Sequence, residues 1–257
     1  MGTPLKNWDI NIYRGVLTGC NEAFIIDGKK KAEIIASDPK SAEIIRPILR
    51  GRDIKRYSYE FAELYIIATF PSLKIDIEAY PAVKQHLLSF GHDRLKQTGE
   101  IGARKKTNNK WFETQDSISY WEDFYKQKIV WGNLNLKASY TFADAGVYIN
   151  APCPLIVPAS KYLLAVLNSK LADYYIRSLG VTRNGGYFEY KPMFVEKLPV
   201  PVITKEKKDL IEDRITKIID VNYNSSKEEE EEIIDSYIYD LYDLNQEEIA
   251  FIKHSEA

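Results

Sequence analysis

The sequence predicts an α+β fold, with a largely antiparallel sheet as the body, helices at its periphery and a helical tail at the C-terminus. Three observations support this class. Short β-branched and aromatic runs separated by turn residues are typical of antiparallel strands. Segments nearer the C-terminus carry apolar residues at three-to-four spacing, which is typical of amphipathic helices. The 257 residues, 45% of them hydrophobic, are enough to bury a core in one large domain or two small ones.

Short elements alternate over the first 110 residues. Asp38 and Pro39 have the residue types of an N-cap and a first helical position, where proline loses no hydrogen bond. The run from Leu64 to Phe70 is apolar enough for a strand with both faces buried. In chain order we predict strands over 13–16 and 22–26, helices over 30–36 and 38–45, a strand over 64–70, a helix over 81–88 and a polar loop over 90–109.

The second half of the chain moves from strands to helices. Turn residues separate four further strands, as an antiparallel meander requires: residues 128–131, 138–142, 146–150 and 155–157. One amphipathic helix follows over 161–179 and stops at Gly180. Thr204 is expected to cap a helix through about Tyr223, including Val221, and another helix covers 230–242. Asn245 with Glu248 three residues on predicts a capping box for a short last helix.

The charge divides the chain after Thr204. Residues 205–257 hold 7 Lys and Arg against 16 Asp and Glu, whereas residues 1–204 hold 28 against 21. A basic body favours a polyanionic partner, because neutralised phosphates release condensed counterions. We therefore predict a nucleic-acid-binding body over 1–204 and a helical tail over 205–257 that packs on the body or on a partner domain.

Several classes of protein lack their markers here. No apolar run reaches the length of a membrane span, so we expect no membrane association. Cys20 and Cys153 form no CxxC pair and the three histidines lie far apart, which predicts no metal site and suits a reducing cytoplasm. Nucleotide-binding, zincin and hydrolase motifs are missing. Two acid-x-Lys triplets, beginning at Asp53 and Glu206, are better explained as a basic turn and a first helical turn than as a nuclease site.

Three segments carry side chains suited to DNA. Arginine donates two parallel hydrogen bonds to phosphate or guanine, asparagine pairs with adenine, and aromatic rings stack on bases. The first segment surrounds Gly51, the second is the basic loop from Arg94 to Trp111, and the third surrounds Gly185 and Gly186. The predicted DNA-binding residues are Arg50, Arg52, Lys55, Arg56, Arg94, Arg104, Lys105, Lys106, Asn108, Lys110, Arg183, Asn184, Tyr187 and Lys191.

Each segment also has a structural interpretation. The first is equally a solvated turn whose cations pair with Asp53 and Glu60. The second is equally a surface loop kept in solution by its charge, and the third a Gly-Gly turn between a helix and a strand. No single segment decides between these interpretations.

An ordered set of motifs resembles the TaqI-like C-terminal specificity domain, which follows the catalytic core of many adenine-N6 DNA methyltransferases and of Type IIG restriction-modification enzymes. The matching segments are Gly15 to Ile26, Ile44 to Tyr57, Tyr162 to Leu171, Gly185 to Phe188, Val195 to Pro201 and Ile233 to Ile249. They occur in the family's order and are spread along the chain from residue 15 to residue 249. The Asn-Pro-Pro-Tyr-type catalytic motif and the glycine-rich cofactor motif of the methyltransferase are missing from the sequence.

The resemblance implies that residues 1–204 form a DNA-binding target recognition domain, with a fold similar to that of a Type I specificity subunit. It also implies a fragment without catalytic residues or cofactor of its own, which binds double-stranded DNA beside the methyltransferase or nuclease domains of a parent enzyme. The parent would use S-adenosylmethionine to methylate adenine; Mg²⁺ and DNA cleavage stay open. Because the ordered motifs look structural, we expect readout in the loops between them, first of all in the loop from Arg94 to Trp111. We also expect phosphates to be held by Arg50, Arg52, Lys55 and Arg56. The side chains expected near base edges are Arg104, Lys105, Asn108, Arg183, Asn184 and Tyr187.

Two other functions stay open on the sequence alone. A protein-interaction module would dock a methyltransferase subunit without DNA specificity of its own. An autonomous nuclease would cleave DNA with a divalent metal.

Overall fold

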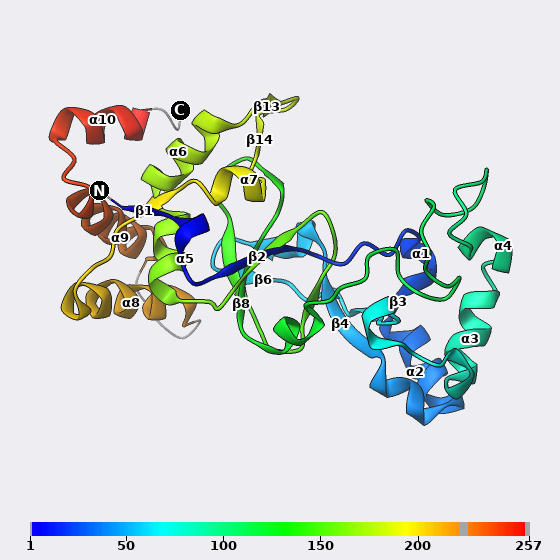
Figure 1. The fold of residues 1–257 in the computed structure, drawn as a ribbon. Coiled ribbons are helices and arrows are strands. Elements are labelled where there is room, and N and C mark those ends of the chain that lie inside the picture. The colour runs from blue at the N-terminus through cyan, green and yellow to red at the C-terminus, as the bar shows by residue number, and fades with distance from the viewer. Residues whose placement is uncertain (1, 221–225, 255–257) are drawn as a thin grey trace.

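The computed structural model describes residues 2–220 and 226–254 and has the predicted mixed fold with largely antiparallel sheets. Figure 1 shows a β-body at the centre of an elongated molecule. On one side of this body lies a helical lobe, residues 161–220 and 226–254, which also lies beside the N-terminus. On the other side lies a small lobe, residues 20–45 and 67–112, with shorter helices.

The central sheet is antiparallel and has the order β10–β8–β12–β2. Its strands are β2 (Asn11–Arg14), β8 (Lys128–Trp131), β10 (Tyr140–Ala143) and β12 (Pro154–Val157). Val130 lies opposite both Thr141 and Leu155. Every residue of β8 and β12 is buried, because the helical lobe covers one face of this sheet and a second sheet lies against the other.

The second sheet is mixed and has the order β11–β4–β7–β3. Its strands are β3 (Ile25–Asp27), β4 (Ile45–Leu49), β7 (Leu64–Ile67) and β11 (Tyr148–Ile149). β11 runs parallel to β4, so the predicted antiparallel meander is wrong at this strand. The packing supplies the reason: the Tyr148 ring stacks on Phe124 at 4.3 Å and lies 5.6 Å from Phe70, inside the core between the sheets.

Short strand pairs complete the body. β1 (Thr3–Pro4) pairs with β15 (Pro199–Val200), β5 (Ile54–Lys55) pairs with β6 (Ser58–Tyr59), and β14 (Tyr187–Glu189) lies between β13 (Thr182–Arg183) and β9 (Leu134–Asn135). Single 3-10 turns connect the longer elements: Leu5–Asn7, Pro39–Glu43, Gly51–Asp53, Pro71–Leu73, Ile77–Ala79 and Trp121–Tyr125.

The small lobe carries helices α1 (Asn21–Phe24), α2 (Gly28–Ser37), α3 (Pro81–Leu88) and α4 (His92–Leu95). The predicted helices at 30–36 and 81–88 are confirmed. The strand predicted at 22–26 is wrong in its first half, because one helical turn buries Ala23 and Phe24 together, whereas neighbouring strand residues face opposite ways. The helix predicted at 38–45 is a 3-10 turn that ends at Glu43 and leads into β4.

The single helix predicted over 161–179 is two helices, α5 (Lys161–Asn168) and α6 (Lys170–Leu179). Between them Ser169 has extended backbone angles, φ −66° and ψ 152°, and its side chain accepts from the Ala172 amide. The break is stabilised from outside, since Asp235 accepts a 2.9 Å hydrogen bond from the Lys170 amide. Helix α7 (Pro192–Val195) follows the β13–β14 hairpin.

The last three helices are α8 (Lys205–Ile219), α9 (Lys227–Leu241) and α10 (Gln246–His254). Thr204 caps α8 as predicted, and Asn245 and Glu248 form the predicted capping box. α8 ends at Ile219, and the predicted continuation through Val221 and Tyr223 lies outside the described residues. α8 packs along α5, where Lys161 Nζ donates to Thr216 Oγ1 at 2.7 Å. The domain boundary after Thr204 stays a prediction.

Three clusters of buried apolar side chains follow this arrangement. One joins the central sheet to the helical lobe and includes Trp131 and Leu163. The second fills the space between the two sheets and includes Ile48 and Leu155. The third is the core of the small lobe, around Phe24. The small lobe therefore has its own core, on which surface loops can be held in fixed positions.

Candidate nucleic-acid interface

The basic loop after α4 forms a hydrogen-bonded arm over residues 96–107. Backbone hydrogen bonds join its two halves: the Arg104 amide donates to the Lys96 carbonyl at 2.9 Å, and the Thr107 amide donates to the Gln97 carbonyl at 3.0 Å. The Gly99 amide donates to the Arg104 carbonyl at 3.0 Å. In Figure 1 the chain after α4 lies at the end of the molecule away from both termini. The arm is an ordered projection of the small lobe.

Arg104 lies inside this arm, which contradicts its predicted place at base edges. The side chain is buried, and its guanidinium donates to four backbone carbonyls, of Leu95, Thr18, Glu113 and Trp111, at 2.7–2.9 Å. Burial lowers the pKa of Arg104 to about 10. Because its hydrogen-bond donors point into the protein, Arg104 fixes the arm to the small lobe and is not available to DNA.

The lysines of the same segment point outward. Lys105, Lys106 and Lys110 are exposed, and Asn108 is exposed between them. Lys110 Nζ also lies 5.5 Å from the centre of the Phe112 ring. Arg94 is half exposed, with Nη2 3.5 Å from Glu22 Oε2, a surface contact that a phosphate could replace. These five predicted side chains can reach a phosphate backbone.

The segment around Gly51 keeps only part of its predicted cationic surface. Arg50 makes a bidentate pair with buried Asp53, at 2.8 and 3.0 Å, which is the pairing that the structural interpretation required. The hydrogen bond from Arg50 to this carboxylate raises the pKa of the guanidinium. Arg52 and Lys55 are exposed, and Lys55 Nζ donates to the Arg52 carbonyl. Arg52 and Lys55 therefore stay candidates for phosphate contact.

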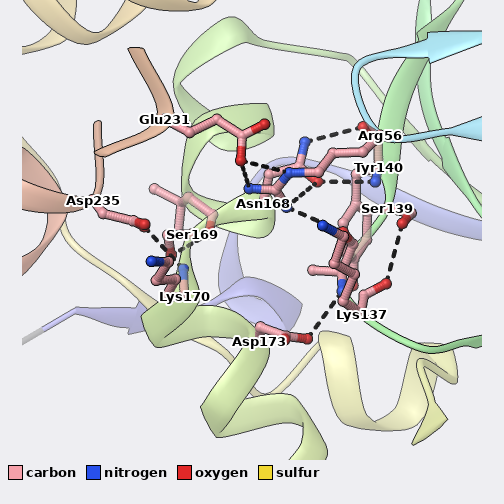
Figure 2. Close-up of polar contacts among 12 residues, drawn as sticks. Arg56, Lys137, Ser139, Tyr140, Asn168, Ser169, Lys170, Asp173, Glu231 and Asp235 are labelled. Atoms are coloured by element: carbon pink, nitrogen blue, oxygen red, sulfur yellow. Dashed lines mark hydrogen bonds and ion pairs between the residues drawn. The ribbon is translucent and has the colours of Figure 1, made fainter. Parts of the chain in front are cut away.

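Arg56 is committed to the contact between the body and the tail. Its Nε and Nη2 donate to Glu231 of α9 at 2.9 and 2.6 Å, and Nη1 donates to the Ala138 carbonyl at 3.1 Å and to Asn168 Oδ1 at 3.4 Å. Figure 2 shows the guanidinium among these groups, with Asp235 of the same helix next to Lys170. The prediction that Arg56 holds a phosphate is wrong, because the side chain is largely buried and joins three elements.

The third segment is the β13–β14 hairpin. Gly185 and Gly186 form its tip with φ of 80° and 78°, a region that suits glycine, and Asn184 and Tyr187 are exposed beside them. Arg183 and Lys191 both pair with Glu189, at 2.5 and 2.8 Å. Hydrogen bonds from Lys191 and Arg183 hold the pKa of Glu189 below its ordinary value. The hairpin thus presents an amide and a phenol more freely than it presents charge.

The three segments do not form one patch. Figure 1 places the β13–β14 hairpin beside α6 and α7, whereas the arm follows α4 on the far side of the β-body. The strand pair β5–β6, which contains Lys55, lies on the body between them. A ligand that contacted all three would have to be long, and a DNA duplex is such a ligand.

The comparison with protein families decides the family. Residues 46–200 match the model of the TaqI-like C-terminal specificity domain. This chain belongs to that family. The match runs from β4, through the arm and the hairpin, to β15.

A curated relative and two solved structures are consistent with this family assignment. The type II methyltransferase M.BstVI of Geobacillus stearothermophilus is 23% identical over 97% of this chain. The Type IIL restriction-modification enzyme MmeI, solved in complex with DNA, matches 99% of the chain at a TM-score of 0.66 and 13% identity. The type IIG restriction endonuclease BpuSI matches 93% at 0.54 and 14% identity. The two structures show a shared fold.

The specificity domain corresponds to only part of each of these proteins. The chain covers 42% of the length of M.BstVI, 36% of the MmeI chain and 31% of the BpuSI chain. Within residues 2–220 and 226–254, three or more His, Cys, Asp or Glu side chains nowhere gather as a metal site would require. In the same residues, helices long and apolar enough to cross a bilayer are lacking.

One exposed residue of the arm is missing from the sequence-based prediction. Ile101, at the end of the arm, is fully exposed and is the most exposed large apolar side chain in the described part of the chain. The signal was present in the sequence, since Ile101 is the single β-branched apolar residue between Leu95 and Trp111. The predicted DNA-binding residues of this loop are cations and one amide, chosen for their polar groups.

Proposed function

We propose that this specificity domain binds double-stranded DNA in a sequence-specific manner and directs an adenine-N6 methyltransferase core, with or without an endonuclease, that lies outside this chain. The family match over residues 46–200 is the observation that carries the proposal. The arm and the residues that follow it support the proposal, because Lys105, Lys106 and Lys110 are exposed on a hydrogen-bonded backbone. Lysine charges placed in this way position a protein on a phosphate backbone.

The distribution of contacts supports duplex DNA over other polyanions. Exposed cations and amides lie on three separate projections, and base readout requires donors that are fixed in position and not merely positive. Asn108, Asn184 and Tyr187 are exposed neighbours of the cationic positions and are the side chains suited to base edges. In this proposal Lys105, Lys106, Lys110, Arg52 and Lys55 bind phosphates.

The catalytic chemistry belongs to the parent enzyme in this proposal. S-adenosylmethionine, and Mg²⁺ if the parent also cuts DNA, would be bound by its other domains. The chain itself would supply no reacting group. We propose a cytoplasmic protein, in line with two free cysteines, both buried.

The test is selection of duplexes from a randomised pool by the purified chain at moderate salt, followed by sequencing of the retained DNA. We expect enrichment of one short motif, and a preference for that motif over random DNA that survives when the salt concentration is raised. Binding of all duplexes with equal affinity would contradict sequence recognition by this chain. Cleavage of the pool with a divalent metal would point to a nuclease instead.

A second function has its own structural support. Exposed apolar side chains occur near the β13–β14 hairpin: Leu134, Leu136, Val181 and Met193. A surface of this kind is suited to docking another protein domain. Co-purification with a methyltransferase fragment, together with equal binding to all duplexes, would favour a docking module without DNA specificity.

A further inference from the structure

The tip of the arm combines a fixed backbone with an unusually exposed apolar side chain. The Ala103 amide donates to the Glu100 carbonyl at 3.0 Å, which closes a four-residue turn with Ile101 in its second position. Gly102, in the third position, has φ of 86°, as a type II turn requires. This turn needs a glycine at 102 but places no demand for an apolar residue at 101.

The base of the arm holds this tip in place. Besides the four bonds of Arg104, the buried Gln97 side chain donates to the carbonyls of Lys110 and Glu113 at 3.2 and 3.1 Å. Gln97 Oε1 accepts from Thr107 Oγ1 at 2.7 Å. Both segments of the arm are therefore tied to the small lobe, and Ile101 is presented at a defined position.

The tip of the arm carries both positive charge and an apolar side chain, which suits a polyanion that also presents an apolar group. Lys105 and Lys106 are exposed on the segment that leaves the tip, and Lys96, on the segment that enters it, pairs with Asp93 at 2.7 Å. The Glu100 carboxylate is the one acidic group of the arm itself, and it accepts from Thr98 Oγ1 at 3.2 Å. The exposed Ile101 and the two exposed lysines thus belong to the same projection of the small lobe.

The major groove of DNA can accept both a projecting, positively charged arm and the apolar side chain at its tip. It is wide enough to admit an α-helix or a two-stranded ribbon. The arm consists of two segments held together by backbone hydrogen bonds and closed by a turn. The edges of the base pairs there present donors, acceptors and a single apolar group, the C5-methyl of thymine. We infer that the arm enters the major groove and that Ile101 contacts the methyl group of one thymine in the target site. This inference rests on the proposed function and names one residue and one base within it.

The test replaces thymine by deoxyuridine, which removes only that methyl group. Each thymine of the selected duplex is replaced in turn, and the affinities of the wild-type chain and of Ile101→Ala are measured. We expect about a fourfold loss for the wild type at one position, the effect of one buried methyl group. We expect Ile101→Ala to bind the unmodified duplex more weakly and to lose the discrimination at that position.

Two further variants make the result specific. Ile101→Val keeps a branched apolar group and should keep most of the discrimination. Val202→Ala removes another exposed apolar side chain, between β15 and α8, and should behave as the wild type. Melting temperatures check that all variants fold, which an exposed tip residue makes straightforward.

The contrary outcomes are distinct. If deoxyuridine has no effect at any position, or if Ile101→Ala discriminates as the wild type does, Ile101 does not read thymine, while DNA recognition by the chain stands. A selected motif without thymine has the same meaning. If the randomised pool shows no enrichment, the proposed function falls and this inference falls with it.

Discussion

Residues 50–56 and 94–110 carry the same kind of side chain, four cations in the first stretch and six in the second. The fold uses them differently. In the first stretch Arg50 and Arg56 are neutralised by the carboxylates of Asp53 and Glu231. In the second, buried Arg104 binds only backbone carbonyls, so that its charge is not cancelled by these contacts.

This difference shows how the kind of cation affects whether it stays exposed to a ligand. A guanidinium has five donors in a planar fork and can satisfy several internal acceptors at once, whereas an ammonium on a flexible stem stays hydrated. In both stretches the arginines mostly bind inward and the lysines stay outside. The arm consequently keeps a positive surface, while the first stretch offers Arg52 and Lys55 alone.

The strongest test of this contrast is Arg104→Ala. The change leaves four carbonyls without their donor and should lower the free energy of unfolding by about 4 kcal/mol. Urea denaturation measures it, and Lys105→Ala on the neighbouring exposed residue is the matched control, with an expected change within about 0.5 kcal/mol. Equal stability of the two variants would mean that Arg104 is not an anchor.

The next largest effect is expected for Arg56→Ala, with about 2–3 kcal/mol lost, because Glu231 is left partly buried without its partner. Lys55→Ala, one residue away and exposed, should cost almost nothing in stability. A double-mutant cycle with Glu231→Gln measures the coupling between body and tail. A coupling energy near zero would contradict the role of Arg56 as a joint.

Lys128 is an exception among the lysines, because its side chain is buried like that of Arg104. It lies on β8, donates to the Asp144 carbonyl at 2.7 Å, and burial lowers its pKa to about 8. Between pH 8 and 10 the unfolded chain therefore binds more protons at this group than the folded chain does, and stability rises with pH. Relative to Lys128→Met, the wild type should gain about 2 kcal/mol over this range.

Denaturation of both proteins across the pH range measures this difference. Lys74→Met, at an exposed position, serves as the control and should keep the pH profile of the wild type. Parallel profiles for the wild type and Lys128→Met would show that Lys128 titrates outside this range.

The smallest expected effect bears on DNA directly. Lys105→Ala combined with Lys106→Ala should weaken binding to every duplex about tenfold and reduce the slope of log affinity against log salt by about 1.8, the value for two phosphate contacts. Lys205→Ala with Lys207→Ala changes the same charge on exposed positions of α8 and should leave the slope unchanged. Equal slopes for the two double variants would remove the arm from the interface.

Helix starts and caps could be predicted from the sequence, because residues close together in the chain determine them. Pro81 at the start of α3, Thr204 as the cap of α8 and the reciprocal cap of Asn245 and Glu248 follow from short-range rules. The break at Ser169 did not, because the bond from the Lys170 amide to Asp235 joins residues 65 positions apart. The pairing of β11 with β4 could not be predicted from local sequence either, since β4 lies about a hundred residues earlier.

The sequence by itself determined the mixed fold class, most helices and strands, and the likeness to a specificity domain, because these depend on local pattern and on motif order. Only the tertiary structure decided which predicted site residues can meet DNA. From the sequence, Arg56 and Arg104 are expected to be surface cations. In the structure Arg56 donates to Glu231, and Arg104 donates to four backbone carbonyls. Formal charge is a property of the residue, whereas availability depends on acceptors that distant segments bring within hydrogen-bond reach.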